Sequence, residues 1–300
     1  MSLIKPPLTR QLGGSGIEIS SLAWGMWRFA GLEMSAARAA IDAVLAAGIT
    51  LFDTADIYGI GETHFGAAEE LLGRIFADAP ELREKMVLAT KGGITPPVPY
   101  DSSAEYLSAA IDNSLKRLGT DRIDLWQIHR PDILTHPLEI ACTVEEAVNA
   151  GKIRAFGVSN FTSSQIATLE QFCPVPIVST QPELSALRVE PIENGELDQA
   201  MAMNMAVLAW SPLGGGRIGD PTNQREQNVA AALSGVAAAH SVSRTAAAYS
   251  WIMAHPARPI PIVGSQNPAR ISEAADAFKV QWTRADWYSV LVASRGTPLP

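Results

Sequence analysis

The stretch KMVLATKGGITPPVPYDSSAEYLSAAIDNSLKRLGTDRIDLWQIHR, residues 85–130, decides the fold class of this chain. It begins with a short apolar run (85–93) and ends with another (122–130), and both have the composition of buried strands. Between them, residues 102–119 have helical spacing, begin with two serines and end at Gly119. A strand, a helix and a second strand in this order predict a parallel β-α-β unit.

The same alternation continues on both sides of this stretch. Six further apolar runs of the strand type are present, at 21–25, 49–55, 152–161, 176–184, 205–213 and 258–265. Segments with helical spacing separate most of them, which predicts an α/β protein that closes into a (β/α)8 TIM barrel, with residues 1–300 as one domain. A doubly wound open sheet is the alternative, but the G-x-G-x-x-G expected after its first strand does not follow residues 21–25.

Two segments depart from this repeat. The glycines of GGSG (13–16) separate two short stretches of alternating polarity, which predicts an N-terminal β-hairpin ahead of the barrel. After the seventh strand, GGGRIGDPTNQREQ (214–227) is a long glycine-rich loop. Long loops at this end of a barrel strand are where binding residues are usually found, so we expect a ligand there.

Composition argues against several classes of protein. The chain has 23 basic and 31 acidic residues, a net charge of −8 and no basic block, which argues against nucleic acid or an anionic membrane as partner. No apolar leader and no apolar span of about 18 residues is present, so we expect a cytoplasmic protein. Cys142 and Cys173 have neither a CxxC spacing nor a nearby histidine pair, and we expect two reduced thiols.

Polar residues occur where the predicted strands end. FDTADIYG (52–59) begins inside an apolar run, yet it carries Asp53 in a place where an unpaired charge is costly. The second strand ends at Asp53 and leads to Tyr58, the third ends at Lys91, and the fourth ends at His129. Because the carboxyl ends of barrel strands surround one mouth, we expect these four side chains to converge there.

Together these residues predict a phenol that donates a proton. A free tyrosine has a pKa of about 10 and is a poor acid at neutral pH, and a neighbouring ammonium group lowers that pKa. We expect Lys91 to act on Tyr58 in this way, Asp53 to pair with Lys91, and His129 to orient a carbonyl oxygen. Each residue alone has an ordinary structural explanation, but four at the ends of three consecutive strands favour a catalytic site. Asp56 is assigned to a turn.

A metal-dependent hydrolase on the same barrel would need several ligands at strand ends. Of the five histidines, only His129 lies at such an end, so no metal site is predicted.

The motifs FDTADIYG, ATKGG, LWQIHRPD, GVSNF and WSPLGGG, in this order, resemble those of the aldo-keto reductases. The resemblance runs from TRQLG (9–13) to the final helix, and GMWRF (25–29) with LGGGR resembles a bacterial subgroup of uncharacterised oxidoreductases. It implies a barrel that binds NADPH and reduces an aldehyde or ketone to an alcohol by hydride transfer. In that reaction Tyr58 would be the general acid, Lys91 and Asp53 would tune it, and His129 would guide the carbonyl.

The resemblance also implies the cofactor site. Ser159, Asn160 and Gln181 match residues that hold the nicotinamide carboxamide, and Trp210 takes the place of an aromatic ring, usually tyrosine, that stacks on the nicotinamide. The expected pyrophosphate loop comprises Ser211, Leu213, Gly214, Gly215, Gly216 and Arg217. The expected adenosine-phosphate residues are Gly264, Ser265, Gln266, Arg270 and Glu273.

The adenosine motif departs from the family in two places. Gln266 stands where many relatives carry Lys or Arg, which removes a positive charge from the 2′-phosphate pocket. Ala274 stands where many carry Asn, which removes a group that hydrogen-bonds adenine. NADPH is still expected because Arg270 is kept, and use of NADH is also possible.

The substrate is expected to be a small carbonyl compound. Met26, Trp27, Ile57 and Arg130 flank the four central residues and are predicted to line its pocket, whereas Trp126, inside a strand, is assigned to the core. The alternative function is a slow-turnover NADPH-binding sensor or regulatory subunit that acts through a protein partner. The potassium-channel β subunits, which resemble this family, are of that kind. Because all four catalytic positions are filled, the sequence favours the enzyme.

Overall fold

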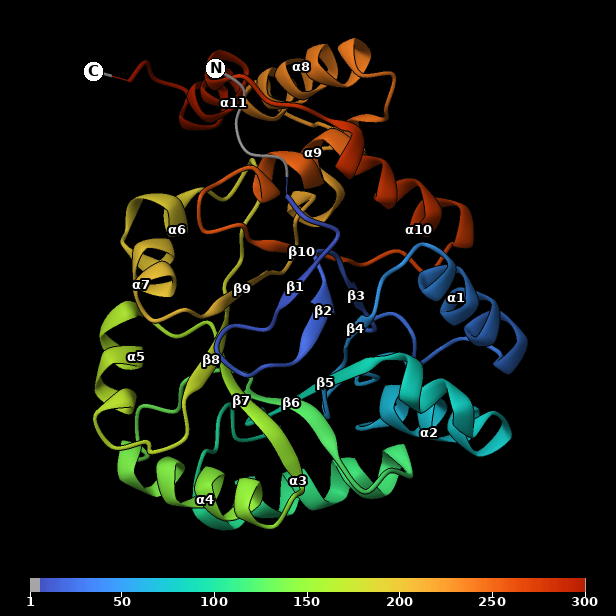
Figure 1. The fold of residues 1–300 in the computed structure, drawn as a ribbon, viewed down its shortest axis with the longest axis vertical. Coiled ribbons are helices and arrows are strands. Elements are labelled where there is room, and N and C mark those ends of the chain that lie inside the picture. The colour runs from blue at the N-terminus through green and yellow to red at the C-terminus, as the bar shows by residue number, and fades with distance from the viewer. Residues whose placement is uncertain (1–5, 300) are drawn as a thin grey trace.

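Eight parallel strands form a closed barrel at the centre of the computed structural model, which describes residues 6–299 (Figure 1). Around the barrel the order is β10-β3-β4-β5-β6-β7-β8-β9. The strands are β3 (Ala23–Gly25), β4 (Leu51–Asp53), β5 (Val87–Gly92), β6 (Ile123–Ile128), β7 (Ile153–Ser159), β8 (Ile177–Gln181), β9 (Ala206–Ala209) and β10 (Ile260–Val263). Each lies within one of the eight predicted runs, so the TIM barrel is confirmed.

Helices cover the outside of the barrel, and α8 and α11 pack against each other at one edge of the ring (Figure 1). Sequence signals explain their limits: Ser103 accepts a hydrogen bond from the Tyr106 N–H at the start of α3, and Gly119 ends it in the left-handed conformation. The helices are α1 (Met34–Ala46), α2 (Ala67–Asp78), α3 (Ala104–Leu118), α4 (Pro137–Asn149), α5 (Ser163–Glu170), α6 (Glu190–Glu193), α7 (Glu196–Ala202), α8 (Gln224–Ala239), α9 (Arg244–Met253), α10 (Pro268–Ala274) and α11 (Arg284–Arg295).

The predicted hairpin closes the barrel floor. Strands β1 (Thr9–Gln11) and β2 (Glu18–Ser20) pair antiparallel and cross the middle of the barrel in Figure 1. Apolar side chains from the hairpin and its turn, Leu12, Ile17 and Ile19, join the cluster that fills the barrel interior. Gly13 has a φ of 52°, and a Cβ there would overlap the carbonyl oxygen of Val178, so the turn requires glycine.

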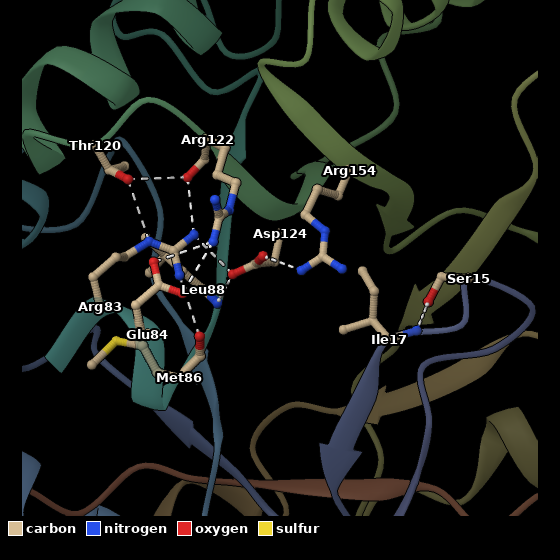
Figure 2. Close-up of polar contacts among 10 residues, drawn as sticks. All are labelled: Ser15, Ile17, Arg83, Glu84, Met86, Leu88, Thr120, Arg122, Asp124 and Arg154. Carbon is tan, nitrogen blue, oxygen red and sulfur yellow. Dashed lines mark hydrogen bonds and ion pairs between the residues drawn. The ribbon is translucent and has the colours of Figure 1, made fainter. Parts of the chain in front are cut away.

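An ion-pair network joins the amino ends of three strands (Figure 2). Asp124 of β6 lies between Arg83 and Arg154, with Oδ2 2.9 Å from Arg83 Nη2 and Oδ1 2.8 Å from Arg154 Nη1. The backbone N–H of Leu88 on β5 also donates to this carboxylate at 2.9 Å. Because both carboxylate oxygens have partners and the network lies at the end opposite the mouth, it stabilises the barrel rather than forming a reactive site.

The barrel interior changes from apolar to polar along each strand. Side chains two residues apart point to the same face, so each inward-facing residue near the floor is followed by another nearer the mouth. The lower residues are apolar and the upper ones polar, and all are buried: Leu51 and Asp53, Ala89 and Lys91, Leu125 and Gln127. The apolar lower layer supports a polar upper layer that lies directly beneath the mouth.

Substitution by alanine should have opposite effects on the free energy of unfolding at two helical glycines. A Cβ on Gly73 of α2 would overlap the carbonyl oxygen of Arg117 at the end of α3, whereas one on Gly235 of α8 would meet open space. We expect Gly73→Ala to lower the free energy of unfolding by about 1–3 kcal/mol. We expect Gly235→Ala to raise it by about 0.5–1 kcal/mol through helix propensity. Urea unfolding of both variants tests this, and equal shifts would contradict the close packing of α2 on α3.

Two further properties concern the whole described chain. Within residues 6–299, no helix combines the length and apolar character needed to cross a membrane. Cys142 is exposed on α4, Cys173 is half-buried after α5, and both are free thiols, as predicted.

Candidate active site

A cleft of about 1080 Å³ opens at the carboxyl ends of the barrel strands. Asp53, Tyr58 and His129 line its inner part, and Lys91 lies behind them, fully buried. The structure therefore brings the four predicted catalytic side chains together, from β4, β5, the loop after β4 and the end of β6.

Lys91 and Asp53 form a buried ion pair. Lys91 Nζ lies 2.7 Å from Asp53 Oδ2, and it also donates to the carbonyl oxygen of Thr54 at 2.7 Å. The same nitrogen is 5.0 Å from the centre of the Tyr58 ring. Burial alone would lower the pKa of Lys91, but the Asp53 carboxylate and Tyr58 outweigh it and the pKa is raised. Lys91 is therefore an ammonium group at neutral pH.

Burial dominates the acidity of Tyr58. The surrounding protein raises the pKa of this phenol above its ordinary value, and the lowering effect of Lys91 only limits the rise, while Asp53 adds to it. The sequence-based prediction of a lowered pKa is therefore wrong in its net direction, although Lys91 acts as expected. The phenol keeps its proton at neutral pH, which is the form that a proton donor requires.

His129 lies beside Tyr58, with ring centres 5.9 Å apart and the rings edge to face. Burial and the charges of Lys91 and Arg130 hold the pKa of His129 well below its ordinary value, so the imidazole is neutral. Its Nδ1 is buried and has no hydrogen-bond partner within residues 6–299. Because a buried N–H without an acceptor is rarer than a buried lone pair without a donor, the favoured tautomer carries its proton on Nε2.

Of the residues expected to hold a nicotinamide, Gln181 and Trp210 line the cleft in a way that fits that group. Gln181 lines the cleft, and its Nε2 donates to Asp53 Oδ1 at 3.0 Å, so Oε1 is the atom of this amide that could accept from a carboxamide N–H. Trp210 lines the cleft and donates to Asn160 Oδ1 at 2.9 Å.

Asn160 also donates to the His129 carbonyl oxygen and to Ser159 Oγ. Both amide hydrogens of Asn160 are therefore used within the protein, and this side chain fixes the indole of Trp210.

The glycine-rich loop after β9 presents bare backbone to the cleft. Gly215 and Gly216 have positive φ values of 69° and 95°, and a Cβ on either would meet open space. Glycines there allow a pyrophosphate to approach the backbone closely, and Ser211 and Leu213 line the same wall.

Two predicted members of this loop, Gly214 and Arg217, are outside the cleft lining. Gly214 packs on Leu187, and Arg217 donates to the Gly214 carbonyl oxygen and pairs with Glu226.

All five residues predicted to bind the adenosine phosphate line the cleft: Gly264, Ser265, Gln266, Arg270 and Glu273. Gln266 uses its amide hydrogens within the protein: Nε2 donates to the Gly25 carbonyl oxygen at 2.9 Å, which joins the end of β10 to that of β3, and to the Gly264 carbonyl oxygen at 3.4 Å. Thr245 and Tyr249 of α9 also line the cleft, and no local motif marks them in the sequence.

The predicted substrate residues separate into two groups. Trp27 is 49% exposed and lines the cleft, and so does Arg130, whose guanidinium carbon is 5.8 Å from the centre of the Trp210 ring. Met26 is fully buried in the core, so the prediction that it lines the pocket is wrong, and Ile57 is outside the cleft lining. Trp126 is fully buried, which confirms its assignment to the core.

Two charged residues of the cleft were also missed. Arg28 lines it with its guanidinium carbon 4.0 Å from the centre of the Trp27 ring, and Asp220 lines it from the glycine-rich loop. Arg28 lies within GMWRF (25–29) and Asp220 within the glycine-rich loop (214–227), so their places in these segments were the signal that could have identified them.

Asp56 is more than a turn residue. It is 1% exposed, and Tyr106 donates a hydrogen bond to its Oδ2 at 3.3 Å. Burial first, and then the nearby Glu69, raise the pKa of Asp56 to about 8, and Arg117 opposes this only in part. Asp56 is therefore mostly neutral at pH 7 in the folded protein.

The Asp56 carboxyl should make stability depend on pH. Its pKa is about 8 in the folded chain and roughly 3.9 in an unfolded one, so the folded state binds more protons between these values. The free energy of unfolding should therefore fall as pH rises from about 4 to about 8, by up to about 1.4 kcal/mol per pH unit. We expect Asp56→Asn to flatten this slope in urea unfolding between pH 5 and pH 8. Parallel slopes for the variant and the wild type would contradict the assignment.

The closed barrel, the buried ion pair behind a tyrosine and the long glycine-walled cleft define an oxidoreductase of the TIM-barrel class. The sequence model of the aldo/keto reductase family matches residues 21–291. The chain belongs to the aldo/keto reductase family.

Several known proteins are similar to this chain. One from Novosphingobium aromaticivorans, named 6-dehydroglucose reductase, is 59% identical over 298 residues that cover 98% of each chain. A protein of the same name from Agrobacterium fabrum is 36% identical and covers 93% of this chain and 96% of its own. The solved structure of a thermostable aldo-keto reductase with the inhibitor epalrestat matches with a TM-score of 0.83 at 24% identity. That match covers 96% of this chain and 100% of the other, and it supports the fold.

Proposed function

We propose that this protein reduces the aldehyde group of 6-dehydroglucose to an alcohol, with NADPH as the hydride donor and Tyr58 as the general acid. The observation that carries the reductase assignment is the buried Lys91–Asp53 pair directly behind Tyr58, at the inner end of a cleft with glycine walls. The substrate is proposed because two relatives of nearly full length carry this name, one of them at 59% identity.

In this reaction NADPH, when bound, supplies a hydride to the carbonyl carbon. Tyr58 gives its hydroxyl proton to the carbonyl oxygen, and His129 orients that oxygen through its Nε2–H. The Lys91 ammonium stabilises the phenolate that remains on Tyr58 until a proton from solvent replaces the one transferred. The balance is one aldehyde, one NADPH and one proton consumed, and one primary alcohol and one NADP⁺ formed.

Two features of the cleft support the ligands proposed. Arg270 at the adenosine end supplies a positive charge for a 2′-phosphate, which favours NADPH over NADH, although Gln266 adds no charge. At the other end, Trp27 offers an exposed indole face and Arg130 offers hydrogen-bond donors, which suit the apolar face and the hydroxyl groups of a sugar. A small-molecule substrate, without nucleic acid or membrane partners, and a cytoplasmic location remain predictions.

The test follows NADPH oxidation by absorbance with 6-dehydroglucose and with simple aldehydes and ketones that lack hydroxyl groups. We expect turnover with a higher kcat/KM for 6-dehydroglucose, and a higher kcat/KM with NADPH than with NADH. Turnover without preference for the sugar would overturn the substrate and leave the reductase. Tight NADPH binding without turnover of any carbonyl would favour a sensor or regulatory subunit instead.

A further inference from the structure

Asp53 is held on both of its carboxylate oxygens. Oδ2 accepts from Lys91, whereas Oδ1 accepts from two carboxamides, Gln181 Nε2 at 3.0 Å and Gln127 Nε2 at 3.3 Å. Asp53 is 2% exposed and Gln127 is fully buried. Gln127 belongs to the LWQIHRPD motif and to the same polar layer of the barrel interior as Asp53, but unlike Asp53 it does not line the cleft, and no role has been assigned to it above.

The orientation of the Gln127 amide is fixed from the opposite side. Ser179 on β8 donates through Oγ to Gln127 Oε1 at 3.4 Å, so the other end of the amide, Nε2, faces Asp53. Gly157 of β7 lies between these two strands, and a Cβ there would overlap Ser179 Oγ and come within 3.3 Å of Gln127 Cγ. A glycine at this point leaves the space in which the serine and the glutamine meet.

These contacts form a continuous path from β8 to the reactive group. It runs from Ser179 to Gln127, then to Asp53, then to Lys91, whose nitrogen lies under the Tyr58 ring. Lys91 and Asp53 act on the phenol in opposite directions, so a small displacement of either changes its acidity. A donor that fixes the carboxylate therefore affects proton transfer without touching the substrate.

We propose that Gln127 is a positioning residue of carbonyl reduction, which holds the Asp53 carboxylate against Lys91 and acts on Tyr58 only through that pair. This rests on the proposed reductase function. A glutamine that merely filled the barrel would need only its volume, and methionine has nearly the same unbranched shape without the amide. The two roles are therefore separable by substitution.

The main test compares Gln127→Met with Thr180→Val. Thr180 is also a buried polar residue of the barrel wall, and its Oγ1 has no partner within residues 6–299. We expect Gln127→Met to lower kcat by roughly 10- to 100-fold, with a smaller change in KM and with NADPH binding retained. Thr180→Val should leave kcat unchanged. A wild-type kcat in Gln127→Met would overturn the proposal.

The pH profile of kcat distinguishes positioning from packing. The titratable groups around this site are Asp53 from β4, Tyr58 and Asp56 from the loop after it, Lys91 from β5 and His129 from the end of β6. Without the Gln127 donor, more of the Asp53 charge acts on Tyr58 and raises its pKa. The part of the kcat profile that reports ionisation of Tyr58 should therefore move to higher pH in Gln127→Met. An unshifted profile would favour packing.

The variant Gln127→Glu should show a pH dependence of activity that differs from that of Gln127→Met. It preserves the shape, and its new carboxyl can donate to Asp53 only while it is protonated. We expect activity close to wild type at the acid end of the profile and a steep loss toward neutral pH, where two carboxylates would face each other. Activity that follows the wild-type profile at every pH would overturn the proposal.

A double-mutant cycle tests the contact without turnover. Gln127→Met is made in the wild type and in Asp53→Asn, and the urea midpoint of unfolding is measured for all four proteins. We expect a larger downward shift in the wild type, because only there does the substitution remove a donor from a buried carboxylate. Additive shifts would overturn the proposed contact. If the shifts are not additive but the protein reduces no carbonyl, the contact stands and the proposed reductase function is wrong.

Discussion

Tyr58→Phe should lower kcat by about 10²- to 10⁴-fold while NADPH binding is retained, because the substitution removes only the hydroxyl proton. The ring that remains fills the same space beside His129, 5.9 Å away, and above Lys91 Nζ, 5.0 Å away. The cleft walls at Trp210 and the glycine-rich loop, where NADPH is proposed to bind, do not depend on that hydroxyl. NADPH oxidation measures the rate, and the fluorescence change on titration with NADPH measures binding.

Tyr100→Phe is the matched control, since Tyr100 is 41% exposed and lies outside the cleft lining. It should keep the full rate. If Tyr58→Phe also kept the full rate, the acid role would have to pass to another donor at the mouth, and His129 is the nearest.

Lys91→Met should lower the free energy of unfolding by about 3–5 kcal/mol and abolish most turnover. The reason is the burial of its partner: Lys91 is fully buried, and its loss leaves the Asp53 carboxylate inside the barrel without a cation. The two glutamine amides on Oδ1 reduce this cost but carry no charge. Urea unfolding at constant pH gives the measurement.

Two controls test whether the loss of stability comes from breaking the buried Lys91–Asp53 ion pair. The double variant Lys91→Met with Asp53→Asn removes both charges, so it should recover most of the stability while it stays inactive. At the surface, Arg38→Met breaks the exposed Arg38–Asp42 pair and should cost no more than about 0.5 kcal/mol. Equal stability of the single and double variants at residues 53 and 91 would mean that the pair is not the cause.

The fold was predictable because its signals are local. Each barrel strand is buried on both faces and therefore appears as a continuous apolar run, and each strand observed lies inside a predicted run. The hairpin was predictable for the same reason, since its glycines and alternating polarity occur within a few residues. Strand lengths were not, because the ends depend on where neighbouring strands stop pairing.

The site was predictable only where a motif and a strand end coincide. Tyr58, Lys91 and His129 meet that condition, and the structure brings them together. The direction of the Tyr58 pKa shift depends on how much protein surrounds the phenol, which no spacing in the sequence reveals. Met26 was misplaced because its neighbour Trp27 is exposed while Met26 itself points into the core.

Contacts between distant segments account for the other misses. Gln266 bonds the carbonyl of Gly25, a residue 241 positions away, because the barrel closes its last strand on its first. Gln127 likewise meets Asp53 from 74 positions away. No local sequence pattern marks either contact, because each forms only when the barrel closes.

The sealed floor of the barrel has a kinetic consequence. Within residues 6–299, Leu12, Ile17 and Ile19 of the hairpin region, with the apolar layer above them, cover the end of the barrel that lies opposite the mouth. The proton that restores the phenol after each turnover must then enter through the same opening by which the alcohol departs. We therefore expect Tyr58 to regain its proton from solvent only after the alcohol has left the cleft.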